Sequence, residues 1–236
     1  MSDNDLEKVA IDCLAFCKAY LTEGLVQLAD IEDIDPDDLA VREEYGIKSQ
    51  YMPRGFYCPS KVMEHCTVNI HRGKIAQRRS KKPTNRFLFD KNGRLFYAET
   101  IFPRGAILPE YIFYKDNVVY GITVYDYTFS HRYDISIAVY NNEKISSFLW
   151  AEVDSKGNDK PWKVDQIYYE TYDHKEDCVL DAYVYHINCS YKLPNASSIW
   201  YQKMRFYTNS DNTVSPKYDH LEETHRTINV PLIFQR

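Results

Sequence analysis

The feature that most limits the fold of this chain is a change of hydrophobic period near residue 66. Beyond that point apolar and aromatic residues recur mostly at every second position, in short segments separated by polar turns. Alternation of this kind is typical of β-strands. The predicted strands cover residues 67–78, 85–90, 94–102, 110–115, 118–128, 133–140, 144–153, 163–172, 178–188, 199–208 and 228–234.

The turns between these segments indicate how the strands pair. Sequences such as Asp90-Lys91-Asn92-Gly93 and Asn141-Asn142 tolerate the positive φ angles of tight hairpins. Their spacing predicts that sequence neighbours pair as an antiparallel meander. With only 8 glycines against 21 tyrosines, glycine-rich nucleotide-binding folds are disfavoured. We expect a mainly β fold of the α+β type, either an open curved sheet or an up-and-down barrel.

The N-terminal part of the chain has a different pattern. Residues 5–29 place apolar side chains at three- and four-residue steps, which predicts one amphipathic helix. A second short helix is expected from Pro36 to about Tyr45, where Gly46 ends it. We therefore divide the chain into an acidic helical segment, 1–46, and a β-meander, 47–236, within one folded unit. The helix is expected to cover one sheet face and leave a tyrosine-rich face partly open.

Charge is distributed unevenly along the chain. Residues 1–44 contain 13 acidic and 3 basic residues, whereas the remaining 192 residues have a net charge of +5. The acidic stretch lacks the frame of an EF-hand, so it predicts docking to a cationic partner instead of calcium binding. Exposed tyrosine rings would add contact area. The predicted partner-binding residues are Asp30, Glu32, Asp33, Asp35, Asp37, Asp38, Tyr111 and Tyr168.

A basic cluster follows in the next part of the sequence. It consists of Arg72, Lys74, Arg78, Arg79, Lys81, Lys82 and Arg86. Such a cluster can hold a phosphate backbone, but the whole chain is acidic and the cluster ends in a typical loop sequence. We expect a solvated hairpin or an internal partner for the acidic N-terminus, and no nucleic-acid binding.

Neither cysteines nor histidines form a recognised reactive motif. The six cysteines are expected to be thiols, with Cys13 and Cys17 in the core, and the group Cys58, His65, Cys66 and His71 matches no zinc-finger spacing. His220 and His225 flank Glu222-Glu223, which permits a general base, but a solvated polar loop is the preferred interpretation. The sequence therefore predicts no catalytic residue, no metal site, no cofactor and no enzymatic activity.

The cellular location is predicted from two features that the sequence lacks, a signal peptide and a membrane-spanning segment. The first residues lack the pattern of a signal peptide, and no apolar run is long enough to span a bilayer. We expect a cytoplasmic protein with no membrane partner.

Two resemblances bear on function. The hairpin from Phe87 to Leu95, with its Asp90-Lys91-Asn92-Gly93-Arg94 turn, resembles the tyrosine–aspartate repeats of rearrangement-hotspot proteins. An acidic helical N-terminus on such a sheet also resembles, in organisation, the immunity proteins of bacterial contact-dependent and polymorphic toxin systems. This resemblance implies a non-enzymatic protein that binds and neutralises a cognate toxin, expected to be basic. The alternative is an up-and-down barrel that holds a small apolar ligand under the N-terminal helix.

Overall fold

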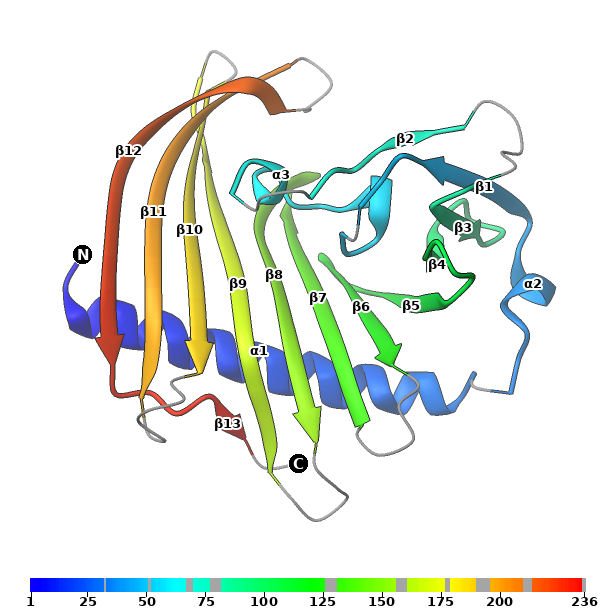
Figure 1. Cartoon of the computed structure of the whole chain (residues 1–236), viewed down its shortest axis with the longest axis horizontal. Helices are drawn as coiled ribbons and strands as arrows, with labels where there is room; N and C mark the ends of the chain where they lie inside the picture. Colours follow the sequence, from blue (N-terminus) through cyan, green and yellow to red (C-terminus); the bar gives the residue numbers. More distant parts are fainter. Residues whose placement is uncertain are drawn as a thin grey trace.

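The computed structural model describes residues 1–31, 33–50, 52–66, 70–76, 82–125, 131–155, 161–176, 179–189, 196–209 and 214–234. Over these residues one long helix, α1 (Asp3–Ala29), packs on a 13-stranded sheet (Figure 1). All strand pairs among these residues are antiparallel, as in the pairs that flank β9 (Trp162–His174). The prediction of a mainly β, antiparallel fold with a packed N-terminal helix is confirmed.

The sheet follows the chain in an up-and-down order. From β3 to β12 each strand pairs with its neighbours in sequence, while β1 lies between β3 and β2, and β13 pairs with the start of β9. In the described part of the chain β12 and β2 do not pair with each other, so the sheet is open and not a barrel. The remaining strands are β1 (Arg42–Ile47), β2 (Lys74–Ile75), β3 (Asn85–Phe89), β4 (Leu95–Ile101), β5 (Ile107–Lys115), β6 (Val118–Tyr125), β7 (His131–Asn141), β8 (Lys144–Ser155), β10 (Val179–Cys189), β11 (Ser197–Thr208), β12 (Val214–Ile228) and β13 (Ile233–Phe234).

Three expectations about element boundaries are wrong. The second helix, α2, covers only Pro36–Leu39, and Arg42–Ile47 is the strand β1, because pairing with β3 overrides a weak helical pattern. In the predicted strand 67–78 only Lys74–Ile75 is a described strand; residues 67–69, 77 and 78 lie outside the described part. Of the predicted strand 228–234, only β13 is a separate strand.

The helix α1 crosses the sheet from β12 to β6. Ser2 and Asp5 form a capping box at its N-terminus, and its 27 residues span about 40 Å, enough to cross seven or eight strands spaced about 4.8 Å apart. Asp3 lies 3.7 Å from Arg226 of β12, and Gln27 donates a 2.8 Å hydrogen bond to the Tyr120 hydroxyl of β6. The buried stripe of α1 consists of Leu6, Ala10, Cys13, Cys17, Leu21 and Gly24.

The face of the sheet opposite α1 is also covered in part: of its tyrosines, Tyr168 is 2% exposed and Tyr218 of β12 is 40% exposed, so the expected tyrosine-rich face is less open than the alternation suggests. Ile137 and Leu149 belong to the core beneath α1, whereas their neighbours Ala138 and Phe148 point to the opposite face. That face packs against the connection between β1 and β2, whose described residues are 48–50, 52–66 and 70–73 and which we call the covering segment (Figure 1). It carries the 3₁₀ turn η1 (Gly55–Tyr57) and α3 (Met63–Cys66), and it buries Met52, Cys58, Val62 and Met63.

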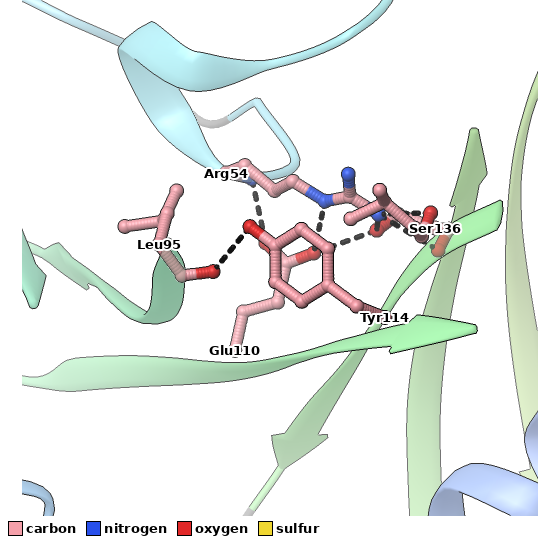
Figure 2. Close-up of polar contacts among 6 residues, drawn as sticks. Arg54, Leu95, Glu110, Tyr114 and Ser136 are labelled. Atoms are coloured by element: carbon pink, nitrogen blue, oxygen red, sulfur yellow. Dashed lines mark hydrogen bonds and ion pairs between the residues drawn. The ribbon is translucent and has the colours of Figure 1, made fainter. Parts of the chain in front are cut away.

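A buried ion pair fastens the covering segment to the sheet. The side chains of Arg54 and Glu110 are 3% and 7% exposed, and their Nε and Oε1 atoms lie 3.6 Å apart. The backbone N–H of Arg54 donates to Glu110 Oε2 at 2.5 Å, while Ser136 donates to Oε1 at 2.7 Å. Figure 2 shows the covering segment, β5 and β7 converging on this group. Gly121 lies beside this ion pair, and the position requires glycine because a Cβ there would overlap the Glu110 carboxylate.

A second buried carboxylate fastens the covering segment further along. Glu170 of β9 is 0% exposed and accepts hydrogen bonds from the hydroxyls of Ser60 and Tyr172. Ser60 also accepts the backbone N–H of Met63 at 2.7 Å, and the N–H of Lys61 donates to Tyr172 at 2.9 Å. Burial raises the pKa of Glu170 to about 7.

The close approach of α1 to β6 yields a first prediction. A Cβ at Gly24 would lie 2.7 Å from Ile122 Cγ1, so Gly24→Leu should overpack this contact and lower the free energy of unfolding by about 1–3 kcal/mol. Urea denaturation measures the change. Val26→Leu, at a position 63% exposed on the same helix, should alter stability by less than about 0.5 kcal/mol. Equal stability of Gly24→Leu and the parent chain would contradict this packing.

Candidate partner-binding surface

The acidic stretch lies exposed at the C-terminal end of α1. Asp30 is the C-cap of α1, and Asp35 caps α2 by accepting the backbone N–H of Asp37 at 3.0 Å. Pro36 at the first helical position and the Asp35 cap explain why a short helix starts here. Among the described residues, the carboxylates of Asp30, Asp33 and Asp38 have no ion pair or hydrogen bond, so they remain available to a partner.

Arg86 of β3 holds this stretch against the sheet. Its guanidinium pairs with Asp37, contacts Glu43 at 2.5 Å and lies 3.7 Å from Glu99 of β4. The register explains the grouping, because Arg86 lies directly opposite Glu99 on β4 and Tyr45 on β1. The basic cluster was expected to be either a solvated hairpin or an internal partner for the acidic N-terminus. Arg86 is such an internal partner.

A groove of about 700 Å³ lies beside this charged group. It runs between the end of α1 and strands β4 to β6, and we call it the end groove; its principal lining residues are Leu28, Tyr97, Glu99, Phe102, Ile107 and Tyr111. Phe102 and Ile107 are 39% and 54% exposed. The rings of Tyr97 and Tyr111 pack edge to face with centroids 5.0 Å apart. The groove therefore offers apolar and aromatic surface directly next to carboxylates.

Burial raises the pKa of two tyrosine side chains and one glutamate side chain that line the end groove. Burial, and secondly the neighbouring Glu99, raises the pKa of both Tyr97 and Tyr111, so their hydroxyls remain donors at neutral pH. Tyr97 donates to Glu99 at 3.2 Å. Burial also raises the pKa of Glu99, while Arg86 acts in the opposite direction. These groups form a hydrogen-bonding edge for a ligand with donors of its own.

The structure places most predicted partner-binding residues at one end of the molecule. Asp30, Asp33, Asp35, Asp37 and Asp38 are exposed around α2, and Tyr111 is a half-buried wall of the end groove. Glu32 lies outside the described residues.

The prediction for Tyr168 is wrong. This residue is 2% exposed, because it points to the face opposite α1, where its ring packs edge to face on His186 at 4.6 Å. Alternation alone did not reveal that this face is covered.

Sequence reasoning missed the apolar part of the surface. The sequence pattern places Leu28 in the predicted helix and Phe102 at the end of a predicted strand, leaves Ile107 between two strands, and gives none of them a role in binding. The signal in the sequence was an apolar residue directly before the Pro103-Arg104-Gly105 turn, where exposure is expected.

The remaining basic residues of the cluster do not act together. Arg72 pairs with Glu64 at 3.4 Å inside the covering segment, and Lys74 is exposed on β2. Lys82 is exposed and has a partner of its own. Arg78, Arg79 and Lys81 lie outside the described residues.

The histidines flagged in the sequence are not brought together. The segment expected to be a solvated loop is the edge strand β12, with His225 opposite Trp200 and His220 opposite Met204. Four positions of β11 separate these two sites, about 13 Å. His220 Nε2 lies 3.6 Å from Glu223, whose other oxygen accepts the Trp200 indole N–H. The loop expectation is wrong, and the arrangement does not join the two histidines in one acid–base pair.

The soft metal ligands are separate as well. Over the described residues no three His, Cys, Asp or Glu side chains are grouped as a metal ion requires. Cys13, Cys17 and Cys58 are free and buried, and burial raises the pKa of each thiol. Such thiols are poor nucleophiles.

Comparisons with known proteins return nothing similar. No family model matches the sequence, and no match is found among curated proteins or among solved structures. None of the described helices has both the length and the apolar character needed to cross a bilayer.

Proposed function

We propose that this protein is a non-enzymatic binding protein whose partner is a basic protein domain, in the manner of immunity proteins that neutralise a bacterial toxin. The supporting observation is the placement of exposed carboxylates and the apolar end groove at the same end of α1. A cationic partner that inserts an apolar side chain into the groove would meet both features at once.

The charges around the groove favour a cationic partner in two ways. Carboxylates that stay hydrated and unpaired attract a basic domain over about one Debye length and so raise the association rate. Those that are already paired, such as Asp37 with Arg86, keep the rim rigid and limit the ordering entropy lost on binding.

The tyrosine rings of the end groove supply an apolar contact area that carboxylates alone do not. Tyr111 and Tyr97 offer rigid rings that are partly apolar and keep a donor hydroxyl, and such residues dominate binding energies at interfaces. An anchor side chain of the partner, packed against Phe102 and Ile107, would be shielded from water by the acidic rim.

The alternative of a barrel that encloses an apolar ligand loses its geometric basis. The sheet is open between β12 and β2, and the face beneath α1 is filled by buried side chains such as Ile135, Ile137 and Ile187.

The proposal is tested with a toxin domain encoded in the neighbouring reading frame. In isothermal titration, the variant Asp30→Asn/Asp33→Asn/Asp38→Asn should bind about 10-fold more weakly at low salt and show a shallower dependence on salt. Asp116→Asn, at the tip of the β5–β6 hairpin, is the control and should bind like the parent chain. Unchanged affinity and salt dependence of the triple variant would contradict the proposal.

A further inference from the structure

A second concave site lies on the face of the sheet opposite α1. A cleft of about 520 Å³ opens between the covering segment and the ends of β7, β8 and β9, and we call it the upper cleft. Its walls include Phe56, Tyr57, Arg72, Tyr140, Lys144 and His174. The volume falls within the range of small-molecule sites. None of these residues lines the end groove, so the upper cleft has its own chemistry.

Arg72 is held in position at the cleft by the chain around it. Its Nη1 donates to the carbonyl oxygen of Cys58, its Nε lies 3.4 Å from Glu64 Oε2, and its backbone N–H donates to Glu64 Oε1 at 3.0 Å. The Nη2 group has no partner among the described residues. A guanidinium fixed on one side, with unused donors on the other, is prepared to bind an oxyanion without further ordering.

A lysine and a histidine border the same cleft from the sheet. Lys144, at the β7–β8 hairpin, has no ion pair or hydrogen bond from its side chain within the described structure, so its ammonium group can donate to an anion. His174 shares a 2.7 Å hydrogen bond between Nε2 and the carbonyl oxygen of Ile145; since a carbonyl only accepts, Nε2 carries the proton and Nδ1 of the neutral ring is an acceptor. His174 therefore serves as a reporter beside the cleft and not as a donor to the anion.

The charge of the cleft favours an anion. Its lining contains Lys61, Arg72 and Lys144 against Glu64 and Glu143, a net charge of +1 with the histidines neutral. Glu64 is already engaged by Arg72.

Aromatic rings form the remaining wall. Phe56 and Tyr57 pack edge to face with centroids 5.4 Å apart, and Tyr140 lies in the lining with them. We propose that the upper cleft binds a small organic anion with a flat ring, whose phosphate or carboxylate contacts Arg72 and Lys144 while the ring packs on these aromatic side chains.

The contacts of Arg72 also hold the covering segment together, so Arg72 variants alone would not separate binding from folding. Lys144 allows binding to be tested separately from folding, because it is exposed and its side chain makes no ion pair or hydrogen bond within the described residues. Lys91, in the exposed turn between β3 and β4, provides a matched control.

The experiment titrates the protein with adenosine 5′-monophosphate, 4-hydroxybenzoate and uncharged adenosine, followed by NMR and calorimetry. At least one anion should shift the His174 signals and bind in the micromolar to millimolar range, and adenosine should bind at least 10-fold more weakly than its monophosphate. Comparison of adenosine 5′-monophosphate with 4-hydroxybenzoate shows whether the cleft prefers a phosphate or a carboxylate. Lys144→Gln should weaken binding about fivefold, while Lys91→Gln should leave it unchanged.

Three results would overturn the assignment. These are the absence of any shift at His174 with either anion at about 10 mM, binding of uncharged adenosine as tight as that of the anion that binds, and equal affinity of Lys144→Gln and the parent chain for that anion. Each is independent of whether a basic protein binds at the end groove.

Discussion

Replacing Glu110 with Gln should lower the free energy of unfolding by about 3–5 kcal/mol. The substitution leaves the guanidinium of Arg54, which is 3% exposed, without its opposite charge. It also removes one acceptor, because the amide nitrogen of Gln would face the backbone N–H of Arg54 or the hydroxyl of Ser136. Desolvated charge and lost hydrogen bonds act in the same direction.

A double-mutant cycle and a partly exposed ion pair provide the controls. The double variant Arg54→Met/Glu110→Gln should lose much less free energy of unfolding than the two single variants lose together. In the double variant no unpaired charge remains buried. Glu152→Gln breaks a 2.7 Å pair with Arg132 whose side chains are 19% and 34% exposed, and should cost less than about 1 kcal/mol. Chemical denaturation of the parent chain, the two single variants, the double variant and Glu152→Gln measures these values. Additive single changes would show that the pair does not act as a unit.

Glu170→Gln should remove a pH dependence of stability that the parent chain shows between about pH 4.5 and pH 7. Burial raises the pKa of this carboxyl to about 7 in the folded state, from an ordinary value of 4.5. The folded protein therefore binds more protons than the unfolded chain in this interval, and its stability falls as the pH rises through it. The plateau of highest stability lies below pH 4.5 for this group.

The size of the effect follows from the shift. One pKa unit corresponds to 1.36 kcal/mol, so the stability of Glu170→Gln relative to the parent should rise by about 3 kcal/mol between pH 4 and pH 8. Urea denaturation at a series of pH values measures it. Glu143→Gln, at an exposed hairpin, should track the parent at every pH. Parallel profiles of Glu170→Gln and the parent would contradict the burial of an uncharged carboxyl at this position.

The meander was predictable because its strands bury side chains at alternate positions. Alternation in Ile135–Val139 and the polar turn at Asn141-Asn142 define β7, β8 and their pairing. The edge strand β12 was missed for the opposite reason. It pairs on one side only, and from Lys217 to Thr227 all but one of its described side chains are exposed, so no apolar period is required.

The covering segment and its anchors could not be predicted from local pattern. Residues 48–66 show neither a helical nor a strand period, because they bury scattered side chains such as Met52 and Val62 against a sheet already formed. Nothing in the sequence distinguishes the buried Glu110 and Glu170 from exposed glutamates on other strands. Their burial depends on which face the covering segment occupies.

The candidate surface was predictable in its charge but not in its shape. The acidic composition of residues 30–38 predicted exposure, and the five aspartates there that the structure describes are all exposed. The end groove arises only when β4, β5 and the end of α1 come together. The pairing of Arg86 with Asp37 likewise depends on the β1–β3 register.

The central claim, recognition of a basic protein at the end of α1, is tested most directly by hydrogen–deuterium exchange on the complex with the neighbouring toxin domain. The account predicts protection at residues 28–41 and across β4 and β5, with the free chain as reference. Protection confined to β12, or to the upper cleft, with no change at residues 28–41, would contradict it.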